Sequence, residues 1–178
     1  MEIMPKFKRK TAGPSAPAKA PAAHAELPIW SMVFTTVLWL MADLGTKEII
    51  ESESFKETIV IPNVFALTRH HNTGIAFGIQ LPALSQLILS VALIGFIIYV
   101  AVTTLKKNPR QRLLKQILFG IIIGGALGNL ISRFQNGFVT DFLRFPYFPV
   151  FNIADIGVTV GLALLFIVLW RDEVQAPR

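Results

Sequence analysis

The sequence predicts a membrane protein, mostly α-helical, with four transmembrane helices and a small extracytoplasmic β-containing segment between the first two helices. Three observations lead to this fold class. Of the 178 residues, 53% are hydrophobic and only 16% are charged, and the mean hydropathy is +0.56. The apolar residues fall in four long blocks, as membrane-crossing helices require. Lysine and arginine gather in an N-terminal tail and in one short loop.

The chain is expected to have three parts. Residues 1–27 form a basic tail, 28–172 a membrane domain, and 173–178 a short second tail. The first tail is rich in Lys, Pro and Ala and has no apolar block to offset the entropy of ordering, so we expect disorder. No hydrophobic region directly follows its basic residues, so it is not a cleavable signal peptide.

The composition also excludes several kinds of site. The chain has no cysteine, which rules out disulfides, zinc–thiolate centres and cysteine nucleophiles. Its three histidines, two of them adjacent at His70 and His71, do not have the spacing of metal ligands, so we expect no metal and no other cofactor. The formal charge of +6 fits membrane topology and does not indicate a nucleic-acid partner.

The first span is expected at about 29–50. Asp43 and Lys47 lie four residues apart within it, and therefore on one helix face, with the acid on the favourable N-terminal side. Ionisable residues are costly inside a span and usually face the protein interior. Two interpretations remain open: the pair neutralises itself and ties helices together, or it borders a substrate site.

The segment from Glu51 to Leu81 is too polar to cross the membrane. Two stretches rich in β-branched and aromatic residues, broken by Pro62 and Gly74, predict short extended strands at the membrane surface. Asn72, Thr73 and Gly74 have the composition of a turn. The simplest interpretation of Asn72 is a side chain that bonds its own backbone, as turn asparagines do.

The remaining spans are expected at about 84–105, 114–131 and 154–170. Five basic residues crowd the loop between the second and third spans. Because basic loops remain in the cytoplasm, both termini and this loop are predicted to be cytoplasmic. The intervening segments 51–82 and 133–153 then lie on the outer side.

This topology brings two carboxylates to one membrane face. Asp141 follows the third span, and Asp155 opens the fourth, in apolar and aromatic surroundings. Two carboxyls within reach of each other in a desolvated site hold one proton between them. One then takes a proton from water while the other polarises a carbonyl, which is the chemistry of an aspartic protease.

The aromatic residues between these two acids admit two interpretations. They are an interfacial belt, the more common arrangement, or a mobile flap over the site. Pro146 and Pro149 prevent a long helix in either case.

The third span carries two rows of spaced residues. Gly120, Gly124 and Gly128 recur every four residues, a pattern typical of close helix packing. Asn129 and Arg133 lie along a neighbouring line and lead toward the outer surface. Their position beside Asp141 indicates a site rather than packing alone.

Together these motifs resemble the lipoprotein signal peptidase family, also called signal peptidase II. The resemblance extends over roughly Ile29 to Arg171. Five blocks carry it, in order and in register with the four spans: Asp43-Leu-Gly-Thr-Lys47, Asn72-Thr-Gly-Ile-Ala-Phe77, Gly124-Gly-Ala-Leu-Gly-Asn129 with Arg133, Val139-Thr-Asp-Phe142 and Phe151-Asn-Ile-Ala-Asp155.

The resemblance implies an aspartic endopeptidase of the bacterial inner membrane, active toward the periplasmic face. Its substrate would be a prolipoprotein, cut just before a cysteine that bears a diacylglyceryl group. Membrane lipids would be further partners, and we expect a monomer. By resemblance, Asp141 and Asp155 are catalytic. The positions matching the family's substrate contacts are Asn72, Gly74, Asn129, Arg133, Asn152, Asp43 and Lys47.

The sequence departs from the family at two positions. Ser132 stands where an acid usually precedes the arginine, and Ile75 stands where alanine is usual. The first departure bears on how Arg133 is oriented. Neither touches the two aspartates.

Two other functions fit a small membrane protein. A proton-coupled carrier would place its ionisable groups near the bilayer midplane and would show internal repeats. The acids here gather toward one face, and the sequence has no convincing repeat. A non-catalytic scaffold would pack through its glycine stripe and tolerate Asp141→Asn and Asp155→Asn.

Overall fold

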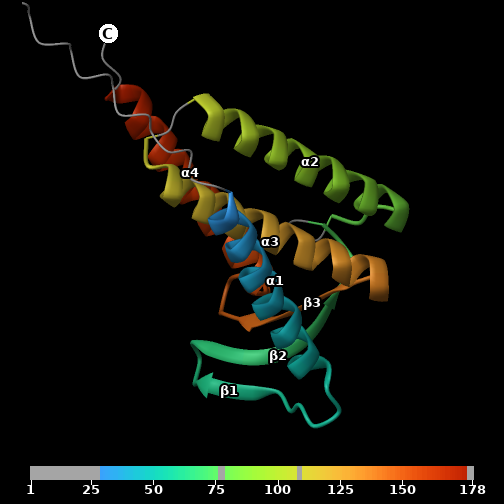
Figure 1. Ribbon diagram of the computed structural model, residues 1–178. Coiled ribbons are helices and arrows are strands. Elements are labelled where there is room, and N and C mark those ends of the chain that lie inside the picture. The colour runs from blue at the N-terminus through green and yellow to red at the C-terminus, as the bar shows by residue number, and fades with distance from the viewer. Residues whose placement is uncertain (1–28, 76–78, 108–109, 176–178) are drawn as a thin grey trace, which may run out of the picture.

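A computed structural model describes residues 29–75, 79–107 and 110–175. Figure 1 shows long helices gathered side by side, with a small sheet at one end. The mostly helical class and the strand-containing segment are therefore confirmed. The elements in chain order are α1 (Trp30–Glu51), β1 (Thr58–Ile61), β2 (Phe65–Asn72), α2 (Ala83–Lys107), α3 (Arg112–Asn136), β3 (Val139–Arg144) and α4 (Ile153–Val174).

The four helices coincide with the four predicted spans. The largest difference is at the end of α3, which continues to Asn136 rather than stopping near Ile131. Among the described residues, α2, α3 and α4 are long and apolar enough to cross a membrane. Helix α1 does not reach this apolar content, because Asp43, Lys47 and three threonines lie within it.

The sheet has the order β1-β2-β3, and both strand pairs are antiparallel. Strands β1 and β2 lie where extended structure was predicted between the first two spans. The prediction was wrong about the stretch after Asn72, since residues 73–75 and 79–81 form no strand and 76–78 lie outside the described residues. Strand β3, between α3 and α4, was not expected. It joins the sheet by pairing with β2, a contact that local sequence does not reveal.

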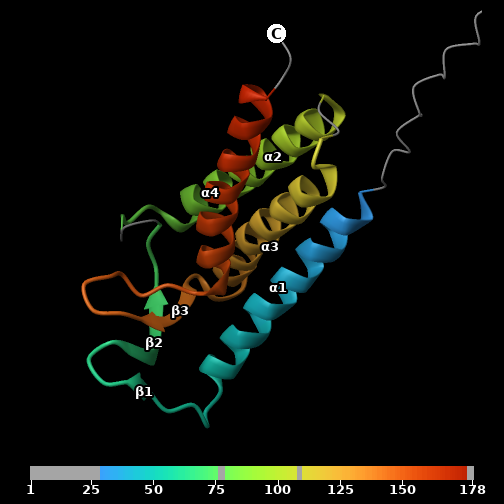
Figure 2. The same ribbon diagram turned by 90° about the vertical axis from the view of Figure 1, so that its left-hand side faces the viewer.

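Helix α3 lies at the centre of the bundle and packs against the other three helices (Figure 2). Its glycine stripe faces α1. A Cβ atom on Gly120 would lie 2.6 Å from the Met32 carbonyl oxygen, and one on Gly124 would lie 2.7 Å from that of Thr36. These distances leave no room for a side chain, so the stripe is a helix-packing face.

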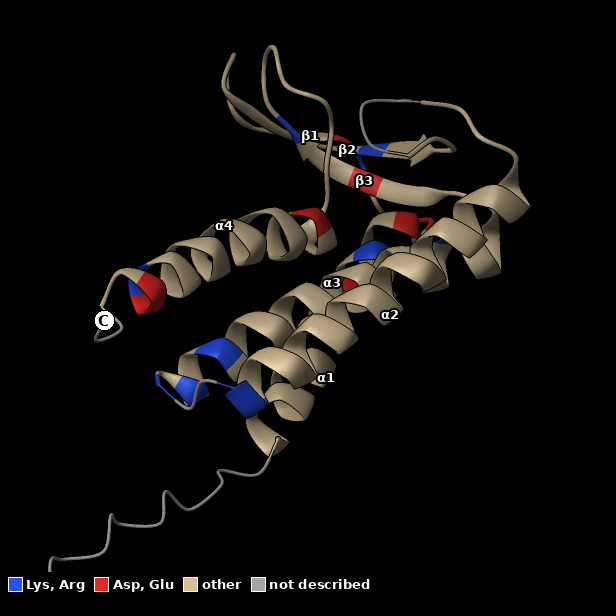
Figure 3. Cartoon of the chain, turned by 90° about the horizontal axis from the view of Figure 1, so that it is seen from above, with Lys and Arg blue, Asp and Glu red and all other residues tan. Residues whose placement is uncertain are grey.

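The end of the bundle opposite the sheet carries a concentration of Lys and Arg where α2 gives way to α3 (Figure 3). One of these residues is not a free surface charge. Lys115, which the sequence places in the basic loop, is completely buried in α3, with its Nζ atom 2.5 Å from Asp172 Oδ2. This ion pair joins the start of α3 to the end of α4, while Arg110 lies 3.7 Å from the same carboxylate.

Candidate active site

Asp141 is positioned by its strand. In the register of β2 and β3 it lies opposite His70, with Asn72 opposite Val139. Its side chain is almost completely buried, and each carboxylate oxygen accepts one hydrogen bond. Asn72 Nδ2 donates to Oδ2 at 2.9 Å, and Asn152 Nδ2 donates to Oδ1 at 2.6 Å.

Asp155 is positioned by the start of α4. Asn152 caps this helix by accepting from the Asp155 amide at 3.0 Å, and Asp155 Oδ2 accepts from the Asn152 amide at 3.2 Å. This reciprocal pair is a capping box, which fixes the carboxylate at the helix N-terminus. Its other oxygen accepts from Asn129 Nδ2 at 2.8 Å, so α3 also holds it.

Asn152 joins the two acids. It is fully buried, its side chain donates to Asp141, and its backbone pairs with Asp155. Both aspartates line a single cavity of about 440 Å³, together with Asn72, Asn129 and Arg133. The predicted meeting of Asn72, Asp141 and Asp155 at one face is therefore present in the structure.

Asp43 and Lys47 lie under this cavity and do not line it. Lys47 Nζ donates to Asp43 Oδ2 at 2.7 Å and to Asn129 Oδ1 at 3.0 Å, and both residues are buried. The second Asp43 oxygen accepts from the Ala154 amide at 2.9 Å. The pair thus ties α1 to α3 and α4, as in the first of the two interpretations. It acts on the site through Asn129.

Arg133 lines the cavity, and Gly74 is hydrogen-bonded to it. The Arg133 Nη2 atom donates to the Gly74 carbonyl at 3.0 Å. The Gly74 amide donates to Asn72 Oδ1 at 2.9 Å. Asn72 therefore forms the expected turn bond with one end of its amide and holds Asp141 with the other.

The two departures from the family pattern have separate structural effects. The buried Ser132 hydroxyl donates to the Gly128 carbonyl at 2.9 Å, so it is used within its own helix. Ile75 lines the cavity, where it adds bulk beside the aspartates.

The electrostatic environment of Asp141 favours its protonated form. The pKa of Asp141 is raised from 3.8 to about 6, mainly by burial and in part by the neighbouring Asp155 charge, against the opposing hydrogen bonds from Asn72 and Asn152. Asp141 is therefore protonated at a higher pH than an ordinary aspartate. A buried carboxyl that titrates near neutrality, beside a second carboxyl, has the properties of an acid–base pair.

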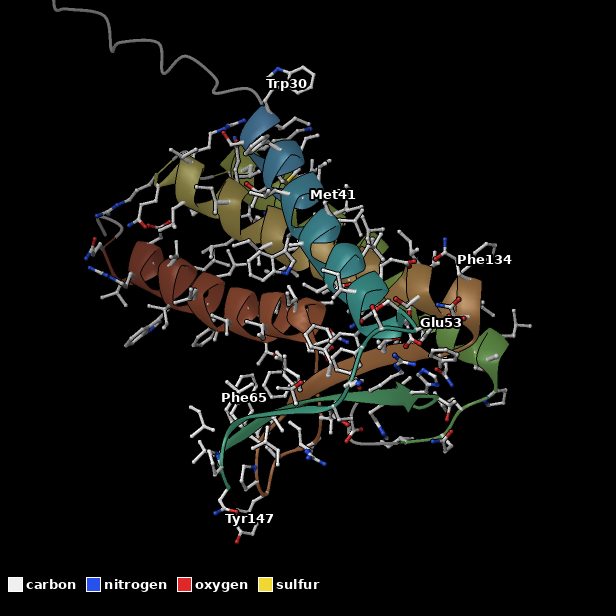
Figure 4. The ribbon with its side chains drawn as sticks, turned by 90° about the horizontal axis from the view of Figure 1, so that it is seen from below. Trp30, Met41, Glu53, Phe65, Phe134 and Tyr147 are labelled. Atoms are coloured by element: carbon white, nitrogen blue, oxygen red, sulfur yellow. The ribbon has the colours of Figure 1, made fainter. Side chains whose placement is uncertain are left out.

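Sequence reasoning missed Thr159 as a wall residue of the cavity. It lies on α4 one turn after Asp155, and the four-residue spacing was the available signal. The aromatic segment divides in the structure. Phe148 and Phe151 line the cavity, whereas Tyr147 is fully exposed and points away from the bundle, as Figure 4 shows.

Two solved structures share this fold. One, described as a bacterial membrane enzyme determined by the in meso method at 2.3 Å resolution, has a TM-score of 0.73 and 29% identity over 84% of this chain and 94% of its own. A second bacterial membrane enzyme, at 1.9 Å resolution, has a TM-score of 0.68 and 30% identity over 81% of this chain and 95% of its own. The fold is thus that of a class of bacterial membrane enzymes.

The sequence narrows this class to one family. The sequence model described as signal peptidase (SPase) II matches residues 35–171. Lipoprotein signal peptidases of Brucella ovis and Brucella abortus are each 35% identical to this chain over 155 residues, which is 82% of this chain and 94% of each relative. The chain belongs to the signal peptidase II family, a family of proteases.

Proposed function

We propose that the chain removes the signal peptide from prolipoproteins as an aspartic endopeptidase, cutting just before a cysteine that carries a diacylglyceryl group. The family and the curated relatives support signal-peptide removal. They do not favour a proton-coupled carrier or a passive scaffold. The observation that carries the catalytic type is the pair of aspartates on one cavity wall, bridged by Asn152.

The proposed reaction uses one proton shared by the two carboxyls. Because the pKa of Asp141 is raised to about 6, Asp141 is suited to hold this proton and to polarise the scissile carbonyl. Asp155 is then the base that takes a proton from the attacking water. The roles reverse as the amine leaves, and no covalent intermediate is needed.

The remaining site residues divide into two groups. Asn72 and Arg133 line the cavity and present amide and guanidinium groups to a peptide, and Gly74 lies beside them, hydrogen-bonded to both. We assign these three to substrate binding, where their hydrogen bonds position the peptide before the reaction. The residues that hold the carboxylates in place are Asn129, which also lines the cavity, and Asn152, Asp43 and Lys47, which do not.

The arrangement in the membrane follows the same proposal. We assign all four helices as spans, including α1, because its charged residues are paired inside the bundle. The basic end is cytoplasmic and the sheet end periplasmic in the bacterial inner membrane, with both termini in the cytoplasm. The membrane domain begins at about residue 28 and runs to Val174, where α4 ends, two residues beyond the predicted boundary at 172, and it acts as a monomer in contact with lipid.

Cleavage of a purified prolipoprotein in detergent micelles tests this function. Asp141→Asn and Asp155→Asn should each abolish cleavage of the lipid-modified precursor while leaving the protein folded, because sharing a proton needs both acids. Glu53→Gln, an exposed carboxylate near the sheet end, is the matched control and should cleave normally. Normal turnover by either aspartate variant would refute the aspartic mechanism. Equal cleavage of an unlipidated precursor would refute the proposed substrate.

A further inference from the structure

Gln86 is a buried polar residue in the first turn of α2, a mostly apolar helix. Its side chain is 5% exposed and its amide is fully engaged. The Nε2 atom donates to the Thr73 carbonyl at 2.8 Å and to the Leu81 carbonyl at 2.7 Å. The Oε1 atom accepts from Arg133 Nε at 3.1 Å. One side chain therefore connects α2, α3 and the residues that follow β2.

Arg133 receives its orientation from neutral oxygens. Gln86 Oε1 accepts from its Nε atom, and the carbonyls of Gly74 and Asn129 accept from its terminal nitrogens at 3.0 and 3.5 Å. Among the described residues, no carboxylate forms an ion pair with this guanidinium. Arg133 lines the cavity, so its charge and its remaining N–H groups can interact with a molecule bound there.

We propose that Gln86 is a positioning residue for substrate recognition: it fixes the Arg133 guanidinium, which lines the cavity, and the adjoining Thr73–Gly74 turn as one unit. This inference rests on the proposed function, in which Arg133 and Gly74 contact the substrate peptide. Gln86 itself does not line the cavity, so it acts through Arg133 and the turn.

The chemistry of glutamine suits this role. An arginine needs an acceptor, and two backbone carbonyls need donors, so the side chain must offer both at one site. Leucine offers neither, and lysine has no acceptor. Ser132, next to Arg133, uses its hydroxyl on the Gly128 carbonyl, so the support for the guanidinium comes from α2 instead.

Kinetic comparison of variants tests the proposal. Gln86→Leu keeps the apolar packing but removes all three hydrogen bonds. We expect its kcat/KM on the lipid-modified precursor to fall by between about ten- and a hundredfold, mainly through KM, since Arg133 binds the peptide before the reaction. In an Arg133→Ala background the same change should cause little further loss. Ser90→Ala, which removes one hydrogen bond one turn later on α2, should leave kcat/KM unchanged.

A spectroscopic measurement tests the positioning without relying on activity. The chain contains no cysteine, so Thr73→Cys introduces a unique thiol for a nitroxide spin label. The label should be clearly more mobile with Gln86→Leu than with Gln86 or with Ser90→Ala. Equal mobility, or losses from Gln86→Leu and Arg133→Ala that simply multiply, would overturn the positioning role. Retained cleavage by Asp141→Asn would instead contradict the catalytic mechanism, so the two failures are distinguishable.

Discussion

Asn152 shows how a single side chain organises the candidate active site. Its Nδ2 group donates to Asp141 Oδ1 and to Asn129 Oδ1, its Oδ1 atom accepts from the Asp155 amide, and its own amide donates to Asp155 Oδ2. A fully buried amide with these partners fixes the separation of two carboxylates that would otherwise repel each other. We therefore propose that Asn152 holds the acids and does not face the substrate, unlike the substrate contact that the family resemblance implies.

Asn152→Ala should destabilise the protein and disturb the acid pair. Loss of the helix cap costs about 1 kcal/mol, and leaving Asp141 Oδ1 without its donor adds about 1–3 kcal/mol. The pKa of Asp141 should rise above its value of about 6, because a hydrogen bond to the ionised form is lost. Thermal unfolding and the pH profile of cleavage measure these effects. Asn136→Ala, at the exposed end of α3, is the control; equal effects from both changes would contradict this role.

The raised pKa of Asp141 also predicts how stability depends on pH. Burial raises this pKa from 3.8 to about 6, so the folded state holds the proton to higher pH than the unfolded state. The neutral form of Asp141 thus contributes about 3 kcal/mol to the free energy of unfolding. This contribution is fully present below about pH 4 and is lost as the pH rises to about 6.

Asp141→Asn removes this titration. The unfolding temperature of the variant minus that of the wild type should increase between pH 4 and pH 7 and then level off. Glu53→Gln, at an exposed position, provides the comparison for ordinary surface charge. A difference that stays constant across this range would show that Asp141 does not titrate near pH 6 in the folded protein.

At the scale of elements, the site depends on how closely α1 and α3 approach. The glycines of α3 that face α1 allow this contact, and a Cβ atom at Gly128 would overlap the Asp43 carboxylate. Asp43 in turn holds the Ala154 amide at the start of α4. Helix packing and site geometry are therefore linked through one carboxylate.

Gly124→Ala tests the packing alone. Its new methyl group would lie 2.7 Å from the Thr36 carbonyl oxygen, so the helices must separate, at a cost of about 1–3 kcal/mol. Thermal unfolding in detergent should report a lower midpoint. Gly95→Ala on α2 is the matched control, because nothing lies within 4 Å of its Cβ position. An unchanged midpoint for Gly124→Ala would mean that the contact is looser than described.

At the scale of the whole molecule, the two ends of the bundle differ in charge and in content. Trp30 and Glu53 lie toward opposite ends of α1 in Figure 4. The sheet and the aspartate pair are at the Glu53 end, and the basic α2–α3 connection is at the other (Figure 3). In the proposed orientation, which follows the positive-inside rule, the basic end is cytoplasmic and the aspartates lie at the periplasmic edge.

Labelling of single cysteines tests this orientation. In spheroplasts, a membrane-impermeant maleimide should label Glu53→Cys at once. Lys107→Cys, at the end of α2, should be labelled only after the membrane is permeabilised, because the bilayer separates it from the reagent. The cysteine-free wild type gives the background. The reverse pattern would invert the proposed topology.

The sequence by itself determined the helices, the family resemblance and most of the polar residues that line the cavity. The reason is that apolar block length and the spacing of polar residues along a helix are local properties, readable without knowing the fold. Thus the helix positions agreed closely with prediction, and so did the convergence of Asn72, Asp141 and Asp155.

Only the tertiary structure decided which partners these residues have. Strand β3 exists because β2 lies beside it, and Gln86 became part of the site because α2 packs where its amide reaches Arg133. Asn129 and Asn152 reach the acids because α3 and the start of α4 pack side by side at the cavity. Contacts between residues that are distant in sequence depend on how whole elements pack. A local sequence pattern does not determine that packing.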